Sequence, residues 1–141
     1  ADFPTTLDFL TENSGGGLTW VGTYGPLSGI TRAAEKGLKI MIDSGFPPMI
    51  VSRAMKGGHF AVLRFVAIFN RKDRNEIARI SALNAALAKA SWECGFLQYK
   101  PPLTSLPFIE EKMDAAHRRQ MVKIKNLLDP VGIFNKGKWG I

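Results

Sequence analysis

The sequence predicts an α+β fold of the ferredoxin-like type, in which a four-stranded antiparallel sheet carries helices on one face. Three observations lead to this prediction. Segments rich in β-branched and aromatic residues alternate with segments of helical apolar spacing, in the order βαββαβ. Glycine or proline stands at almost every junction. The 141 residues, 45% of them apolar, are enough for one hydrophobic core. A further helix and a tail are expected after the sixth element.

The first part of the chain is expected to form a lead-in, a strand and a helix. Residues 1–17 are the lead-in or linker, because they end in a flexible run of one serine and three glycines. Residues 18–24 are rich in β-formers and stop at a Gly-Pro pair, so they form the first strand. Ser28 can cap the following helix, which ends at Gly45. The apolar residues of this helix are Ile30, Ala34, Leu38, Met41 and Ile42.

The middle of the chain is expected to form a hairpin. Two prolines prevent the first helix from continuing, and residues 49–54 read as the second strand. Residues 56–58, Lys-Gly-Gly, form the turn. Residues 59–69 have the strongest strand character in the chain.

The last part is expected to add a helix, a short strand and a final helix. The first of these begins at Asp73 or Asn75 and ends at Gly95. Residues 96–100 form the fourth strand, and residues 107–128 form the last helix, with a proline at its first position. The apolar stripe of the earlier helix is Ile77, Ile80, Leu83, Leu87, Ala90 and Cys94.

The strand at residues 59–69 is apolar on both faces, although alternate side chains of a strand point to opposite sides. One set is Phe60, Val62, Arg64, Val66 and Ile68; the other is His59, Ala61, Leu63, Phe65, Ala67 and Phe69. A sheet covered only by its own helices should have one polar face. The second face is therefore expected to be covered by the last helix, another domain or a ligand. Arg64, the single charge, should meet a carboxylate or an anionic ligand.

The chain is strongly basic, with a net charge of +7 and a pI near 9.8. This balance favours an anionic partner such as nucleic acid, anionic lipid, a phosphate-bearing cofactor or an acidic substrate. The local basic cluster at residues 118–125 is expected to be a solvated helix face. Cys94 is the only cysteine, so no internal disulfide forms and a reducing, cytoplasmic location is expected. Packing in the core is expected for Cys94, Trp20 and Phe65.

Sequence patterns alone indicate no catalytic machinery. The histidines, His59 and His117, lie far from Cys94 in the sequence, and no metal-ligand spacing or Ser-His-Asp set is evident. The glycines at 15–17 lack the context of a phosphate loop. No apolar run is long enough to span a bilayer, and no signal peptide is visible. The start at Ala1 reads as that of a fragment or a processed piece.

Four segments of the chain resemble those of a known protein family. They are GLTWVGTYGP at residues 17–26, KGGHF at 56–60, Tyr99-Lys100, and LLDPVGIFNKGK at 127–138. Together they resemble the C-terminal cap domain of FAD-linked oxidases of the vanillyl-alcohol oxidase, p-cresol methylhydroxylase and glycolate oxidase FAD-subunit superfamily. The first two look like the strand that opens the C-terminal half of the cap and its glycine-rich turn. The third sits where phenol-oxidising members carry a Tyr-Arg pair, and the last is similar to the signature LLDP-x-GI-x-NPGK.

The resemblance implies a two-part flavoenzyme, in which an N-terminal half binds FAD and the cap lays a sheet over the flavin ring. Residues 18–141 would be the C-terminal part of the cap with its closing tail. The implied reaction is oxidation of a 2-hydroxy acid, an aromatic alcohol or an alkylphenol by hydride transfer to the flavin. The chain would be inactive without an FAD-binding domain or subunit. A homo- or hetero-oligomer that binds a small-molecule substrate and no nucleic acid is expected.

The resemblance also implies catalytic roles. Tyr99 would contact the substrate oxygen, and Lys100 would stand where an arginine of the family stabilises a developing phenolate or carboxylate. His59 would face flavin or substrate as a base or a hydrogen-bond donor. Lysine lacks the bidentate fork of arginine, so anion binding through Lys100 would be less directional.

Binding roles are implied as well. Lys138 would replace a second cation of the family. Two further substrate-binding candidates come from the residues themselves: Arg64, as a charge in an apolar strand, and Trp20, if its ring stacks on a ligand instead of packing in the core. Asn135 and Gly137 would lie near the flavin. A lysine also replaces the proline of the usual tail, which loosens the turn. Lysines in place of arginines favour a carboxylate-bearing substrate.

Two other interpretations fit part of the pattern. RNA-recognition-motif domains share the βαββαβ order and a basic charge, but here Gly58 and Leu63 stand where their stacking aromatics belong. A regulatory or oligomerising ferredoxin-like domain that binds a small molecule between sheets would explain the second apolar face, but not the tail.

Overall fold

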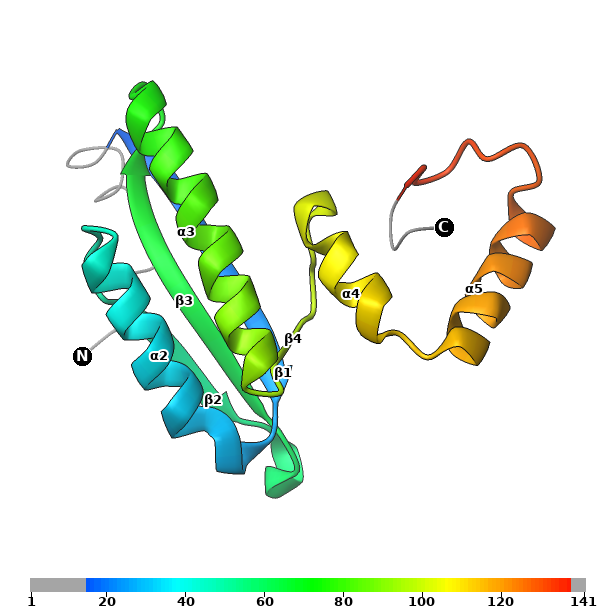
Figure 1. Cartoon of the computed structure of the whole chain (residues 1–141), viewed down its shortest axis with the longest axis horizontal. Helices are drawn as coiled ribbons and strands as arrows, with labels where there is room; N and C mark the ends of the chain where they lie inside the picture. The colour runs from blue at the N-terminus through cyan, green and yellow to red at the C-terminus, as the bar shows by residue number, and fades with distance from the viewer. Residues whose placement is uncertain (1–14, 138–141) are drawn as a thin grey trace. The chain divides into compact units, whose positions relative to one another are not determined.

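The computed structural model describes residues 15–137. The chain divides into an N-terminal unit, Ala1–Lys100, and a C-terminal unit, Pro101–Ile141, each considered by itself. The N-terminal unit contains β1 (Gly16–Gly25), α2 (Ile30–Asp43), β2 (Ile50–Ala54), β3 (Ala61–Asn70), α3 (Arg74–Glu93) and β4 (Leu97–Gln98), labelled in Figure 1. The C-terminal unit contains α4 (Leu106–Lys112) and α5 (Ala115–Leu128). Short 3-10 turns are formed by Leu27–Gly29, Lys56–Gly58 and Leu103–Ser105.

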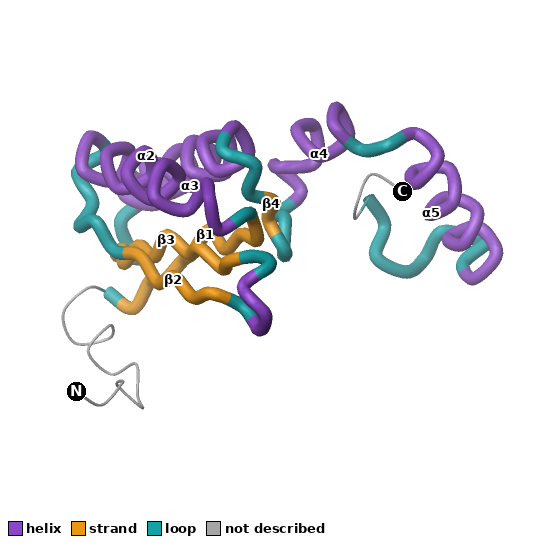
Figure 2. Tube along the Cα trace, turned by 90° about the horizontal axis from the view of Figure 1, so that it is seen from below, coloured by secondary structure: helices purple, strands orange, loops and turns teal. Residues whose placement is uncertain are grey.

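The α+β class and the βαββαβ order predicted from the sequence are confirmed. The strands form one antiparallel sheet in the order β2-β3-β1-β4. The central strands β1 and β3 pair along their whole length, from Gly16 opposite Asn70 to Gly25 opposite Ala61. Figure 2 shows α2 and α3 together on one face of this sheet. Within the described part of the N-terminal unit, no helix covers the opposite face.

The hydrophobic core lies between the sheet and the two helices. Leu63 and Phe65 from β3, Met41 from α2, and Leu83 and Leu87 from α3 are all at most 1% exposed. Burying a side chain of this size stabilises the fold by about 1.5–3 kcal/mol. This layer therefore fixes the helices to one side of the sheet.

A glycine lets α2 approach the sheet closely. A Cβ at Gly37 would lie 2.1 Å from the ring carbons of Phe65, so the aromatic ring fills the space that a side chain would need. The buried stripe of α2 consequently follows Ala33, Gly37 and Met41. The expectation that Ile42 belongs to this stripe is wrong, since its side chain is 59% exposed.

Helix α3 begins and ends as predicted. The Asp73 carboxylate accepts hydrogen bonds from two backbone N–H groups of the first turn, at 2.8 and 3.2 Å. Gly95 follows the helix with a φ of 81°, a conformation that favours glycine. Cys94 is buried, as expected. Of the apolar stripe expected for this helix, Ile77 alone is exposed.

The observed bounds of β1 and β4 differ from those expected from the sequence. β1 begins at Gly16, inside the expected lead-in, because Gly17 allows a close approach to β3. A Cβ at Gly17 would lie 2.2 Å from the carbonyl oxygen of Phe69. β4 is shorter than expected and contains only Leu97–Gln98.

The expectation of one helix at residues 107–128 is wrong, because α4 and α5 are separate. The backbone is extended at Met113, with a ψ of 131°. The Asp114 carboxylate then accepts a hydrogen bond from the N–H of His117 at 2.9 Å. A side-chain cap of this kind gives α5 its own start.

Candidate functional site

The candidate site is the face of the sheet that α2 and α3 leave uncovered, here called the open face. Residues directly opposite each other on paired strands share a face, so the register identifies its members. They include Trp20, Gly22 and Tyr24 of β1, Val51 and Arg53 of β2, Val62, Arg64 and Val66 of β3, and Leu97 of β4. Trp20 is 50% and Leu97 52% exposed, which is much apolar surface for one face. Phe60 and Tyr99 join this face through their ring contacts with Tyr24.

Three aromatic rings cluster on the open face. The ring of Tyr24 meets Phe60 edge-on, with centroids 5.4 Å apart and planes at 80°. The same ring lies 4.8 Å from that of Tyr99, tilted by 33°. Each such pair stabilises by about 0.5–1.5 kcal/mol beyond its buried area. The cluster is a preformed aromatic surface next to the charged centre of the face.

Arg64 and Tyr99 are joined at this centre. The Nε of Arg64 donates a hydrogen bond to the Tyr99 hydroxyl oxygen at 2.9 Å. Tyr99 reaches this position because Gly22, on the strand between them, has no side chain. A Cβ at Gly22 would lie 2.2 Å from the Tyr99 hydroxyl oxygen. The bond uses only Nε, so the terminal N–H groups of Arg64 and the hydroxyl hydrogen of Tyr99 remain as donors.

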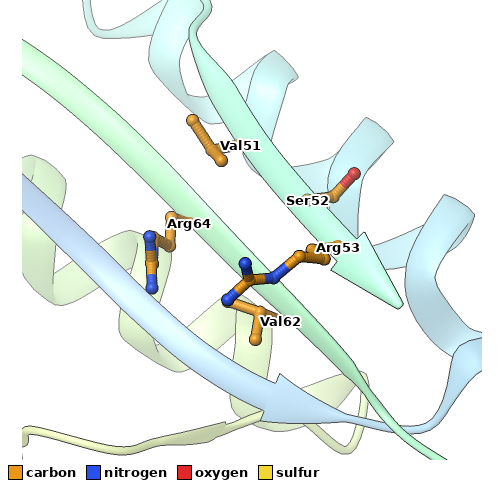
Figure 3. Close-up of a pocket in the computed structure, with 5 residues that line it drawn as sticks. All are labelled: Val51, Ser52, Arg53, Val62 and Arg64. Carbon is orange, nitrogen blue, oxygen red and sulfur yellow. The ribbon is translucent and has the colours of Figure 1, made fainter. Parts of the chain in front are cut away.

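A hollow of roughly 260 Å³ lies beside Arg64. Figure 3 shows its lining, which consists of Val51, Ser52 and Arg53 from β2 and Val62 and Arg64 from β3. Arg53 extends from β2 toward Val62, and Arg64 lies further along β3. Neither guanidinium has a carboxylate partner among residues 15–137, and the open face contains no Asp or Glu. The hollow is therefore positively charged.

Among the described residues of the N-terminal unit, two ion pairs belong to its helices. Glu93 of α3 pairs with Lys36 of α2, and Asp43 pairs with Lys39 within α2. The hydrogen bond from Lys36 holds the pKa of Glu93 below its ordinary value. All four side chains are largely exposed, so these pairs are screened by solvent. They do not balance the charge of the hollow.

A buried carboxylate organises the tail in the C-terminal unit. Asp129, 5% exposed, forms an ion pair with Lys125 and accepts hydrogen bonds from the backbone N–H groups of Ile133 and Phe134, both at 2.9 Å. Lys125 also donates to the carbonyl oxygen of Phe134 at 2.6 Å. The hydrogen bond from Lys125 lowers the pKa of Asp129, and the two backbone N–H groups act in the same direction. This arrangement, the Asp129 loop, gives the LLDP segment a structural role. It leaves exposed the side chains of Leu127, Leu128, Val131, Ile133 and Phe134.

The structure brings together two of the site residues suggested by the sequence, Arg64 and Tyr99, and places Trp20 on the same face. The expectation that Trp20 is a core residue is wrong, whereas it is confirmed for Phe65. His59 is exposed and lies between the turn and β3, before the strand begins. Lys100 is exposed and has no hydrogen-bond or ion-pair partner in the described part of the chain.

The remaining suggested residues belong to the tail. Asn135 and Gly137 are exposed in the C-terminal unit, with positive φ angles of 48° and 75°. Lys138 lies outside the described residues. Between residues 15 and 137 no group of His, Cys, Asp and Glu side chains could hold a metal ion. The helices of the same part are too short or too polar to cross a membrane.

Several members of the open face were missed from the sequence, among them Gly22, Tyr24 and Arg53. The signal for the first two was present, because period-two alternation along β1 puts them on the face of Trp20. The position of Arg53 depends on the register of β2 against β3, which sequence spacing alone does not fix.

The chain was compared with known proteins. No family model and no curated protein matches it. Solved structures do match: p-cresol methylhydroxylase with substrate bound has a TM-score of 0.73 at 19% sequence identity, covering 90% of this chain and 25% of that chain. The isoeugenol complex of 4-ethylphenol oxidase from Gulosibacter chungangensis has a TM-score of 0.73 at 21% identity, covering 89% and 24% respectively. The chain has the fold of one segment of these enzymes.

The superfamily resemblance indicated by the sequence motifs is therefore matched at the level of the fold. The chain spans about a quarter of the length of each enzyme.

Proposed function

We propose that this chain is the C-terminal, substrate-facing part of an FAD-dependent oxidoreductase and acts only together with an FAD-binding domain or subunit. The observation that supports this most is the open face, an apolar and aromatic sheet surface with Arg64 and Tyr99 at its centre. The proteins of similar fold are named for the oxidation of p-cresol and 4-ethylphenol. The proposed reaction is oxidation of a 2-hydroxy acid, an aromatic alcohol or an alkylphenol by hydride transfer.

The open face suits a flat ring system. Tyr24, Tyr99 and Trp20 offer ring surface, and Gly22 lets the Tyr99 ring lie close against β1. FAD, when bound by its own half, accepts the hydride. The apolar open face would exclude water from the reacting groups once it is covered, which strengthens every hydrogen bond made there.

Arg64 and Tyr99 hold the substrate oxygen in this proposal. The Tyr99 hydroxyl accepts from Arg64 and keeps its own hydrogen to donate to a substrate oxygen. Donors fixed in advance stabilise a developing phenolate or carboxylate at no further cost of ordering. Lys100 adds positive charge beside Tyr99, and His59 is the candidate base or hydrogen-bond donor.

The tail has a closing role. Asn135 and Gly137 would contact the flavin and Lys138 the substrate. The Asp129 loop supports this assignment, because it fixes the backbone immediately before these residues. The exposed apolar side chains around that loop provide surface for the FAD-binding half.

Association through the open face tests the proposal. The chain is mixed with the FAD-binding half encoded upstream of or beside it, and size-exclusion chromatography is followed by flavin absorption. We expect co-elution. Leu97→Asp on the open face should abolish it, since a charge would enter an apolar interface. Ile42→Asp, an equally exposed apolar position on α2, is the matched control and should leave association unchanged.

Two results would contradict the proposal. One is equal weakening by both substitutions, which would mean that the open face is not the interface. The other is an absence of association combined with RNA binding that falls steeply with salt, as expected of a basic nucleic-acid-binding module.

A further inference from the structure

We propose that Arg53 and Arg64 form a carboxylate-binding site on the open face, for a substrate that carries a carboxylate next to an aromatic ring. This rests on the proposed function and narrows its substrate class. The fold relatives are named for uncharged alkylphenols. The paired arginines would therefore give this chain a different substrate specificity from that of these two enzymes.

The charge of the hollow favours an anion. Arg64 is half-buried between Val51, its partner on β2, and Val62, two residues earlier on β3. A cation among apolar groups is costly unless an opposite charge pairs with it. No acidic residue of the open face does so, and Arg53 adds a second positive charge. An anionic ligand would satisfy both guanidinium groups at once.

The geometry lets both arginines reach one anion. Val51 pairs with Arg64 and Arg53 pairs with Val62, so the arginines are diagonal neighbours on the same face. Diagonal neighbours stand about 7–8 Å apart at the backbone, within reach of long side chains. The hydrogen bond to Tyr99 orients the Arg64 guanidinium through Nε and leaves its terminal N–H groups unused. Such a fork matches the two oxygens of a carboxylate.

The surroundings favour a carboxylate over a phosphate. Val51 and Val62 line the hollow and offer no donors for the further oxygens of a tetrahedral anion. Ser52 also lines the hollow, but it pairs with Leu63, on the opposite face of the sheet, and Figure 3 shows its hydroxyl directed away from Arg64. Tyr99, the hydrogen-bond partner of Arg64, belongs to the aromatic cluster with Tyr24. An aromatic ring attached to the carboxylate would therefore lie against that cluster while the carboxylate meets the arginines.

Binding of benzoate by the 141-residue chain tests this site. The Nε–H signals of the arginines are followed by NMR during titration with millimolar benzoate, its neutral isostere benzamide, and inorganic phosphate. We expect the Arg53 and Arg64 signals to shift with benzoate and to shift far less with the other two. Arg64→Gln should weaken benzoate binding about tenfold or more, because a charge-assisted hydrogen-bond pair is lost.

Two variants distinguish binding at this site from nonspecific attraction of an anion to a basic chain. Arg53→Gln is the second test variant, since the side chain is exposed and its loss should not affect folding. Arg71→Gln removes the same charge from an exposed position outside the open face and should leave binding unchanged. Equal loss from Arg71→Gln, equal binding of benzamide, tighter binding of phosphate, or no shift at either arginine would each overturn the proposal.

The site and the proposed function fail in different ways. Benzoate binding as expected, without association with any FAD-binding half, would support the site and remove the proposed function. An assembled pair whose flavin is reduced by neutral alkylphenols and not by carboxylate-bearing substrates would retain the function and overturn the site.

Discussion

The Nε of Arg64 donates a hydrogen bond to the Tyr99 hydroxyl at 2.9 Å, although 35 positions separate the two residues in the sequence. The contact crosses β1 at Gly22, an open-face position without a side chain. The hydrogen bond joins the guanidinium of Arg64 to the aromatic cluster of the open face. The proposed chemistry depends on this arrangement.

Tyr99→Phe should release Arg64. The substitution keeps the ring but removes the acceptor of the Nε–H bond. We expect the free energy of unfolding to fall by about 0.5–1.5 kcal/mol, the usual net value of a hydrogen bond, because the pair is only partly buried. Urea unfolding measures this change. Tyr24→Phe is the control, since its hydroxyl makes no hydrogen bond within residues 15–137; an equal loss there would argue against the Arg64 contact.

Gly22→Ala should displace the Tyr99 ring. The new Cβ would lie 2.2 Å from the hydroxyl oxygen and 2.4 Å from the carbon that bears it. These atoms are at the far end of a movable side chain, so we expect only a small stability loss, about 1 kcal/mol or less, against the ~1–3 kcal/mol typical of overpacking. The Arg64 Nε–H signal should shift. In a Tyr99→Ala background Gly22→Ala should be neutral, and persistence of its effect there would contradict the account.

Gly37→Ala should destabilise the core despite improving the helix. Alanine gains about 1 kcal/mol over glycine in a helix interior. The new Cβ, however, would lie 2.1 Å from the buried Phe65 ring, which has no free space to enter. Overpacking of this kind costs about 1–3 kcal/mol, so a net loss is expected in urea unfolding. Adding Phe65→Leu should recover part of the loss; a stabilised single variant would show that α2 is not held against that ring.

The Asp129 loop should open in acid. The pKa of Asp129 is lowered in the folded chain, so the native state binds fewer protons than the unfolded state below the ordinary pKa of aspartate. The stabilisation is complete above about pH 4 and is lost as the pH falls further. Hydrogen-exchange protection of the Ile133 and Phe134 amides should decline in that range. Asp129→Asn should reduce the protection and remove its dependence on pH, while Asp114→Asn, which affects the start of α5, should change neither.

Much of the fold could be predicted from the sequence, because strands and helices here differ clearly in apolar period. The break at Asp114 was missed because a single capping carboxylate ended an otherwise continuous helical pattern. Because β3 has apolar residues on both of its faces, the sequence indicated correctly that the second face of the sheet is largely apolar. The hydrogen-bond partner of Arg64 could not be predicted. Tyr99 reaches Arg64 only because β4 is two residues long and β1 has a glycine at the crossing point. The Asp129 loop was missed for a different reason: its side-chain to backbone hydrogen bonds are local and leave no periodic pattern in the sequence.

The most direct test of the proposed function is the flavin spectrum of the assembled pair. The FAD-binding half is mixed with this chain without oxygen, and a 2-hydroxy acid, an aromatic alcohol or an alkylphenol, neutral or carboxylate-bearing, is added. We predict that one of these classes bleaches the flavin absorption only when the chain is present. Tyr99→Phe should slow the bleaching about tenfold or more, as expected when a fixed donor to a developing anion is lost. A stable pair whose flavin is bleached by none of these substrates, or as fast without this chain, would contradict the proposed function.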